Sequence, residues 1–186
     1  MNLIKKLIFS CLLLSTLAYA PFAQANTETK QTPSIADLSI WERTAILDEG
    51  RIKPLDTYAR TILLQFSGKR TFDRKPAINW FAKLLFTPWE TANDKVFLIN
   101  SPEIPMAMHV EPDQHRRYSY TQLLPGLHKL KELAQAADGI DPKERSVVDQ
   151  EIVRVYNNVG LYLKLHSSFS FAIPGTVCPP ITHNLS

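Results

Sequence analysis

Apolar side chains recur at the spacing of an α-helix in four segments of the chain, and this periodicity largely decides what the chain can fold into. The segments are residues 54–66, 76–88, 123–137 and 141–163. In the first segment the apolar stripe consists of Leu55, Tyr58, Ala59, Ile62, Leu63 and Phe66. Residues three and four apart share one face of a helix, so each stripe predicts a helix that buries one side. We therefore expect a mainly α fold, a small helical domain of about four to five helices with a short β element, and a shorter helix within 34–45.

Proline and glycine indicate where the first two long helices begin and end. Pro54 and Pro76 are expected as first helical residues, because the missing N–H of proline costs nothing at that position. Gly68 follows the first apolar stripe, and Pro88 follows the second. Both residue types commonly terminate helices, so the sequence predicts ends close to these two positions.

The last long helix has a predicted start that differs from the others. Gly139 is expected to end the helix before it. Asp141 is then expected as the N-cap, Pro142 as the first helical residue and Glu144 as the partner that completes a capping box.

The β element is expected in the middle of the chain. Residues 96–99 form a short apolar run, Val-Phe-Leu-Ile, that suits a strand better than a helix. Residues 117–120 are expected to pair with this run as a small antiparallel ribbon. Residues 102–112 contain three prolines and are expected to be irregular.

The first residues have the pattern of a secretory signal peptide. Lys5 and Lys6 precede an apolar run from Leu7 to Leu17, and Ala23-Gln24-Ala25 is a small-x-small cleavage site. We expect residues 1–25 to be removed by a cut after Ala25, which places the protein in the periplasm or otherwise outside the cytoplasm. The alternative is a retained membrane anchor, although the apolar run is shorter than the roughly 18 residues of a spanning helix.

The rest of the chain divides by composition into three parts. Residues 26–45 are expected to form a polar leader and a short helix, and residues 46–167 the helical extracytoplasmic domain. Residues 168–186 hold prolines without periodicity and are expected to form an irregular tail. This tail suggests an abbreviated form of a longer protein.

Charge and cysteine content exclude several classes of function. The chain has a net charge of +3, and the expected signal peptide carries two of its basic residues, so the basic balance gives no reason to expect nucleic-acid binding. Outside that peptide the only cysteine is Cys178, which rules out an internal disulfide and a CxxCH haem-attachment motif. The sequence shows no nucleophile elbow, phosphate loop or HExxH motif. We therefore do not expect an enzyme.

Two histidine-containing stretches are candidate ligand sites. Thioethers and imidazole suit a soft metal such as Cu(I) or a haem iron, so Met106, Met108 and His109 are weak candidates for a metal site. The alternative is that the two methionines point the same way from an extended segment and fill a gap in the core. His115 stands beside two arginines, Arg116 and Arg117, which either grip carboxylates or form a solvated loop.

Two further histidines lie within predicted helices. His128 borders the apolar stripe of the third long helix, and His166 follows the stripe of the last one. We expect both to be structural residues, with axial ligation of haem as the alternative.

The stretch from Glu49 to Phe66, EGRIKPLDTYARTILLQF, combines a glycine, a proline and five charged residues around the start of a predicted helix. Asp56 and Arg60 are four residues apart, so they share a helix face and are expected to pair. The simple interpretation is a helix start with local ion pairs, in which Gly50 makes a tight turn and Arg51 helps to join loop and helix. The other interpretation is a docking surface.

The segment GRIKPLDTYAR, followed by FSGK at residues 66–69, resembles the G-R-x-K-P-L-D-T-x-A-R signature of System II cytochrome c assembly proteins. These are membrane haem-handling proteins of the cytochrome c synthase type, and the likeness extends loosely over residues 46–165. The matching positions are Gly50, Arg51, Lys53, Pro54, Asp56, Thr57 and Arg60. The resemblance implies a process and a place outside the cytoplasm. It implies no catalytic residue, because the haem ligands of such proteins lie in membrane segments.

These observations favour an accessory domain of cytochrome c biogenesis that contacts a membrane haem-handling assembly protein. In this interpretation no cofactor is assigned to the domain itself, and contact with haem is possible through the partner. The alternatives are a periplasmic haem- or copper-binding module and a secreted helical domain with an unrelated partner. An enzyme using Asp56 and Arg60 is the least favoured reading.

Overall fold

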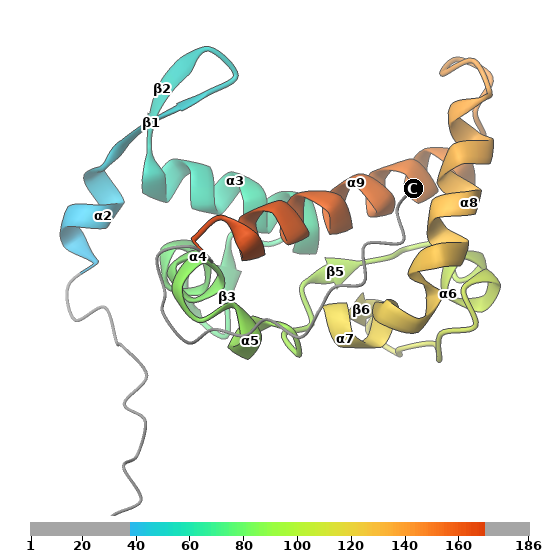
Figure 1. Cartoon of the computed structure of the whole chain (residues 1–186), viewed down its shortest axis with the longest axis horizontal. Helices are drawn as coiled ribbons and strands as arrows, with labels where there is room; N and C mark the ends of the chain where they lie inside the picture. The colour runs from blue at the N-terminus through green and yellow to red at the C-terminus, as the bar shows by residue number, and fades with distance from the viewer. Residues whose placement is uncertain (1–37, 170–186) are drawn as a thin grey trace, which may run out of the picture. The chain divides into compact units, whose positions relative to one another are not determined.

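A computed structural model describes residues 38–169, which belong to one compact unit, Pro33–Ser186. The expected signal peptide, most of the leader, Cys178 and nearly all of the expected tail lie outside the described residues. The fold is mostly helical with short hairpins, as predicted (Figure 1). The elements in chain order are α2 (Ser39–Arg43), β1 (Ala45–Asp48), β2 (Arg51–Pro54), α3 (Leu55–Ser67), β3 (Thr71–Phe72), β4 (Lys75–Pro76), α4 (Ala77–Phe86), α5 (Pro88–Thr91), β5 (Phe97–Leu98), α6 (Glu103–Ala107), β6 (Arg117–Tyr118), α7 (Tyr120–Leu123), the 3-10 helix η1 (Leu124–Gly126), α8 (Leu127–Asp138) and α9 (Val147–Ser167).

The core lies where α3, α4 and α9 pack together, and α8 crosses α9 near the start of that helix (Figure 1). Aromatic rings fill its centre. Phe66 contacts Trp80 of α4 edge-on, with ring centroids 6.1 Å apart, and it also contacts Phe97 of β5. Tyr162 of α9 lies against Phe97 and shares a buried hydrogen bond of 2.9 Å with the hydroxyl of Thr91. One aromatic cluster therefore joins three helices and a strand.

The predicted stripe of α3 is confirmed, and the helix ends as expected. Gly68 takes a left-handed conformation with φ 68°, and its N–H bonds the carbonyl of Leu64. The predicted starts are wrong by one residue, because Pro54 and Pro76 are extended N-caps that also end β-strands. Pro88 is not only a stop signal, since it is the first residue of α5.

The start of the last long helix was predicted five residues too early. The helix begins at Val147, where Ser146 is the N-cap and Asp149 completes the capping box. The segment before it is held as a loop by Arg145, whose guanidinium donates to the carbonyl oxygens of Ile140 and Asp138. These bonds occupy the backbone carbonyls of the loop, and the helix starts only at the next capping sequence.

The proline-rich segment 102–112 is not wholly irregular, because it contains α6. Pro102 is the N-cap of this helix, and Pro105 lies in its first turn. Proline is tolerated there because the first helical N–H groups have no partner within the helix. The predicted helix over 123–137 is likewise interrupted, since Leu124–Gly126, which includes Pro125, forms the 3-10 helix between α7 and α8.

Within residues 38–169, three antiparallel two-stranded sheets complete the fold, and two of them are hairpins. The pairing of β5 with β6 confirms the predicted ribbon, with Phe97 opposite Tyr118. The two hairpins were not predicted, and they flank α3, with β1–β2 before it and β3–β4 after it. In β3–β4 the two turn residues, Asp73 and Arg74, have φ angles of 49° and 60°. Positive φ at both positions defines a type I′ turn, in which an arginine costs about 1 kcal/mol.

Helix α9 is also held by a buried carboxylate. Glu151 accepts hydrogen bonds from the backbone N–H groups of Asn100 and Ser101 at 2.6 and 3.0 Å, and from the hydroxyl of Ser101. Arg154 donates to the same carboxylate at 2.8 Å and to the carbonyl of Leu98 at 3.0 Å. The side chain of Glu151 thus fastens α9 to the segment that leaves β5.

Candidate functional site

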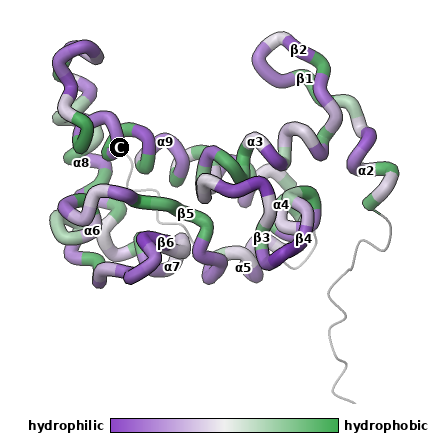
Figure 2. Tube along the Cα trace, turned by 180° about the vertical axis from the view of Figure 1, so that it is seen from behind, coloured by the Kyte–Doolittle hydropathy of each residue, from purple (hydrophilic) through white to green (hydrophobic). Residues whose placement is uncertain are grey.

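The motif that carries the family resemblance is divided between two elements. Its first five residues, Gly50 to Pro54, form the turn and second strand of the β1–β2 hairpin, which projects beyond the start of α3 (Figures 1 and 2), and Leu55 to Arg60 form the first turns of α3. The turn of the hairpin consists of Glu49 and Gly50, with φ angles of 49° and 74°. Asp48 pairs directly with Arg51, so this is a two-residue type I′ loop. Glycine adopts positive φ without strain, and the expectation that Gly50 makes a tight turn is confirmed.

One ion pair crosses the hairpin diagonally, from Asp48 beside the turn to Lys53 nearer the base. The ammonium of Lys53 lies 2.7 Å from the carboxylate of Asp48, and both side chains are three-quarters buried. Tyr58 of α3 lies near this pair: burial raises the pKa of its hydroxyl, and the charge of Asp48 raises that pKa further. The hairpin is therefore anchored on the first turns of α3.

The start of α3 supplies the remaining contacts of the motif. The N–H of Leu55 donates to the carbonyl of Thr44 at 2.8 Å, which joins the helix start to the residue before β1. Asp56 and Arg60 pair at 2.7 Å, as predicted. Thr57 is exposed, and its carbonyl accepts a bond from the hydroxyl of Thr61.

The expected role of Arg51 is not found. Its side chain is exposed, and within residues 38–169 it makes no ion pair with Asp56. Lys53 makes the contact to the loop instead, through Asp48. The reason is the strand geometry: Arg51 stands next to the turn at the end of the hairpin, and Asp56 lies beyond the base in α3.

Sequence reasoning missed an exposed apolar pair on the hairpin. Leu47 and Ile52 lie directly opposite one another in the two strands, and their exposed fractions are 74% and 78%. Directly paired residues of an antiparallel ladder share one face, so the two form a single apolar pair on the surface. The signal was present, because both residues stand two positions from the turn residues Glu49 and Gly50.

The structure separates the weak metal candidates. Met106 is 65% exposed and Met108 is 3% exposed. The expectation that both methionines point the same way from an extended segment is therefore wrong. They occupy the end of α6 and its C-cap. His109 is exposed with φ 57°. Met108 is thus part of the core, while the other two side chains face outward.

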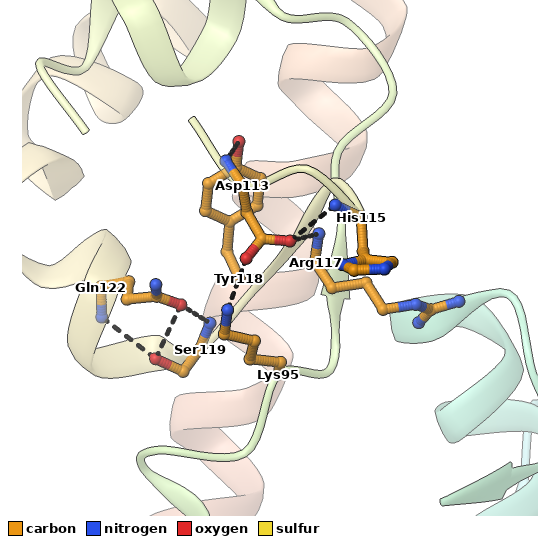
Figure 3. A network of polar contacts seen from close by, with 7 residues as sticks. All are labelled: Lys95, Asp113, His115, Arg117, Tyr118, Ser119 and Gln122. Atoms are coloured by element: carbon orange, nitrogen blue, oxygen red, sulfur yellow. Dashed lines mark hydrogen bonds and ion pairs between the residues drawn. The ribbon is translucent and has the colours of Figure 1, made fainter. Parts of the chain in front are cut away.

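The stretch around His115 is an ordered loop (Figure 3). The carboxylate of Asp113 pairs with Lys95 and accepts bonds from the backbone N–H groups of His115 at 2.9 Å and Arg117 at 3.4 Å. The hydrogen bond from Lys95 lowers the pKa of Asp113. The hydroxyl of Tyr118 accepts a bond from the N–H of Asp113. These contacts fix the backbone, and the guanidinium of Arg117 extends away from them.

The two helical histidines have different environments. His128 is exposed and lies 3.3 Å from Glu132. His166 is half-buried against the ring of Tyr162, and burial lowers its pKa. In the part of the chain described, no three His, Cys, Asp or Glu side chains gather as a metal site would require.

Comparison with known proteins adds no assignment. No protein-family model matches the chain, and the curated proteins contain no match to its sequence. The resemblance carried by GRIKPLDTYAR therefore remains an interpretation of the sequence. Between residues 38 and 169, no helix combines the length and the apolar character needed to cross a membrane.

Proposed function

We propose that the protein is an extracytoplasmic accessory domain of cytochrome c biogenesis that docks on a membrane haem-handling cytochrome c assembly protein. The β1–β2 hairpin is the docking surface. The observation that carries the proposal is the exposed apolar pair Leu47 and Ile52, in the hairpin whose turn and second strand contain the GRIKP part of the motif. The protein has no catalytic role in this proposal, and haem is handled by the partner.

The physics of the hairpin supports docking to another protein. Burying an exposed Leu or Ile side chain contributes roughly 1.5–3 kcal/mol, so covering both Leu47 and Ile52 is a substantial source of affinity. The Lys53–Asp48 pair and the Leu55–Thr44 hydrogen bond already order the hairpin. Less conformational entropy is therefore lost on binding.

The test begins with deletion of the gene, followed by staining of membrane proteins for covalently bound haem. We expect c-type cytochromes to be lost. The deletion strain is then complemented with wild type, with the double variant Leu47→Ser and Ile52→Ser, or with Val147→Ser. Val147 is a matched control, because it is equally exposed but lies at the start of α9.

The two parts of the proposal fail in different ways. Unchanged haem staining in the deletion strain would reject a role in cytochrome biogenesis and favour an unrelated partner. If haem staining is lost in the deletion strain and the double variant restores it, the role in cytochrome biogenesis stands but the hairpin is rejected as the contact surface. We expect Val147→Ser to restore staining and the double variant not to.

A further inference from the structure

A second surface of the molecule is strongly cationic. Residues 68–76 are here named the basic hairpin. They comprise Gly68, the two residues that follow it, β3, the two turn residues and β4. The basic hairpin has a single acidic residue, Asp73, and its basic residues are Lys69, Arg70, Arg74 and Lys75. All five side chains are exposed, and the trace at β4 is strongly hydrophilic in Figure 2.

These cations are not used to hold the fold together. Over the described range 38–169, none of them takes part in an ion pair, whereas Lys53, Lys83 and Lys95 each pair with an aspartate. The net charge of the basic hairpin equals that of the entire chain, which is only +3. Charge is therefore concentrated on this one short segment.

The turn of the basic hairpin holds a cation at its tip in an unfavourable backbone conformation. Arg74 has φ 60°, a conformation that favours glycine or asparagine. Residues in such strained conformations cluster at functional sites. Keeping Arg74 at this position adds a guanidinium at the tip of the hairpin, at the expense of the stability that glycine would provide.

The surroundings of the basic hairpin point to a lipid surface and not to a folded protein. Its single large apolar side chain, Phe72, is directed inward and lies against Trp80. Protein interfaces usually have an apolar or aromatic centre and are depleted of lysine. The basic hairpin offers no such anchor, in contrast to the β1–β2 hairpin with Leu47 and Ile52. Guanidinium and ammonium groups both bind phosphate.

We propose that the basic hairpin binds the anionic headgroups of a membrane surface. Each Lys or Arg close to an anionic bilayer strengthens binding by about fivefold, and salt screens the attraction. Removing four such charges should therefore weaken binding by at least about a hundredfold. This inference does not depend on the proposed role in cytochrome biogenesis, because it concerns the protein and lipid alone.

The test measures co-sedimentation of the full chain, as isolated from cells, with vesicles of phosphatidylcholine with and without phosphatidylglycerol. The neutral vesicles report any binding by the apolar residues near the N-terminus, which all variants share. The basic-hairpin variant replaces all four of its cations by glutamine. The control variant carries the same net charge and replaces Arg43, Lys131, Lys143 and Lys164 by glutamine.

We expect wild type to prefer anionic vesicles and to be released by salt, the control to lose far less affinity, and the basic-hairpin variant to lose about a hundredfold or more. Equal binding by wild type and the basic-hairpin variant would overturn the proposal, as would an equal loss in the control. Capture of the wild type by poly-glutamate but not by anionic vesicles would overturn it too, assigning the surface to an acidic protein.

Folding of the variants is checked by thermal unfolding followed by circular dichroism. A second variant, Arg74→Gly, removes one cation and relieves the strained turn, so it should fold at least as well as wild type. We expect it to bind anionic vesicles about fivefold more weakly. Unchanged binding by a folded Arg74→Gly protein would also count against the proposal.

Discussion

Replacing Glu151 by alanine removes the carboxylate that fastens α9 to the segment leaving β5. The side chain is 8% exposed and receives bonds from Asn100, Ser101 and Arg154. Truncation leaves two backbone N–H groups without their acceptor, and it leaves the guanidinium of Arg154 with only the carbonyl of Leu98. The expected result is a protein that keeps its fold but unfolds more easily.

The size of the effect follows from these contacts. A hydrogen bond to a charged group contributes roughly 1.5–3 kcal/mol, but water replaces part of it where the donors are near the surface. We therefore expect the free energy of unfolding to fall by about 3 kcal/mol. For a domain of this size, the melting temperature should fall by about 10 °C. Glu151→Gln retains an acceptor of similar shape and should lose about half as much.

The pH dependence provides a second readout. Burial by itself raises the pKa of Glu151, but the bonds from Ser101, Asn100 and Arg154 outweigh burial and hold it below the ordinary value of 4.5. Because the folded pKa is the lower one, the unfolded chain binds a proton first as the pH falls. The stabilisation is complete above about pH 4.5 and is lost as the pH falls through the lowered pKa.

The assay is thermal or urea unfolding followed by circular dichroism, for wild type and both variants, between neutral pH and about pH 3. We expect the gap between wild type and Glu151→Gln to close in acid, because glutamine does not titrate. A melting temperature of Glu151→Ala within about 2 °C of wild type would refute the argument. So would a gap that stays constant down to the lowest pH.

Three further predictions are checked by the same unfolding measurements. Gly126→Ala should destabilise by about 2 kcal/mol, because its Cβ would lie 2.7 Å from the Cβ and carbonyl oxygen of Met108; an unchanged melting temperature would show that α6 yields readily. Asp56→Ala should cost only about 0.5 kcal/mol, because Arg60 is largely exposed, and a much larger loss would mean that this pair holds the hairpin. Arg74→Gly should raise stability by up to about 1 kcal/mol, and destabilisation would show that its turn is not strained.

The parts of the fold that sequence reasoning predicted are those in which burial repeats along the chain. The stripe of α3 from Leu55 to Phe66 is continuous, and the run containing Phe97 is buried on a strand. Helix starts were less predictable, because the segments beginning at Asp141 and Ser146 both satisfy local capping rules. The choice depends on the contacts of Arg145 with the carbonyls of its own loop, which the sequence pattern does not reveal.

The candidate site was predicted only in part. The Asp56–Arg60 pair depends on helix spacing alone, so it was found from the sequence. The β1–β2 hairpin was missed because Ile46 is the single aliphatic side chain of its strands that packs against the core, while Leu47 and Ile52 point to the outside. The basic hairpin was missed for a different reason. Its turn residues are Asp73 and Arg74, whereas the sequence signal of a two-residue hairpin turn normally contains glycine.

Helix α3 has a consequence for how these surfaces work together, because it joins the β1–β2 hairpin to the basic hairpin. It has 13 residues, so its ends are separated by about 20 Å. If lipid binds the basic hairpin and a protein partner binds the β1–β2 hairpin, the length of α3 sets the distance of the protein contact from the bilayer. Inserting one residue would lengthen α3 by about 1.5 Å and rotate one hairpin by about 100° relative to the other.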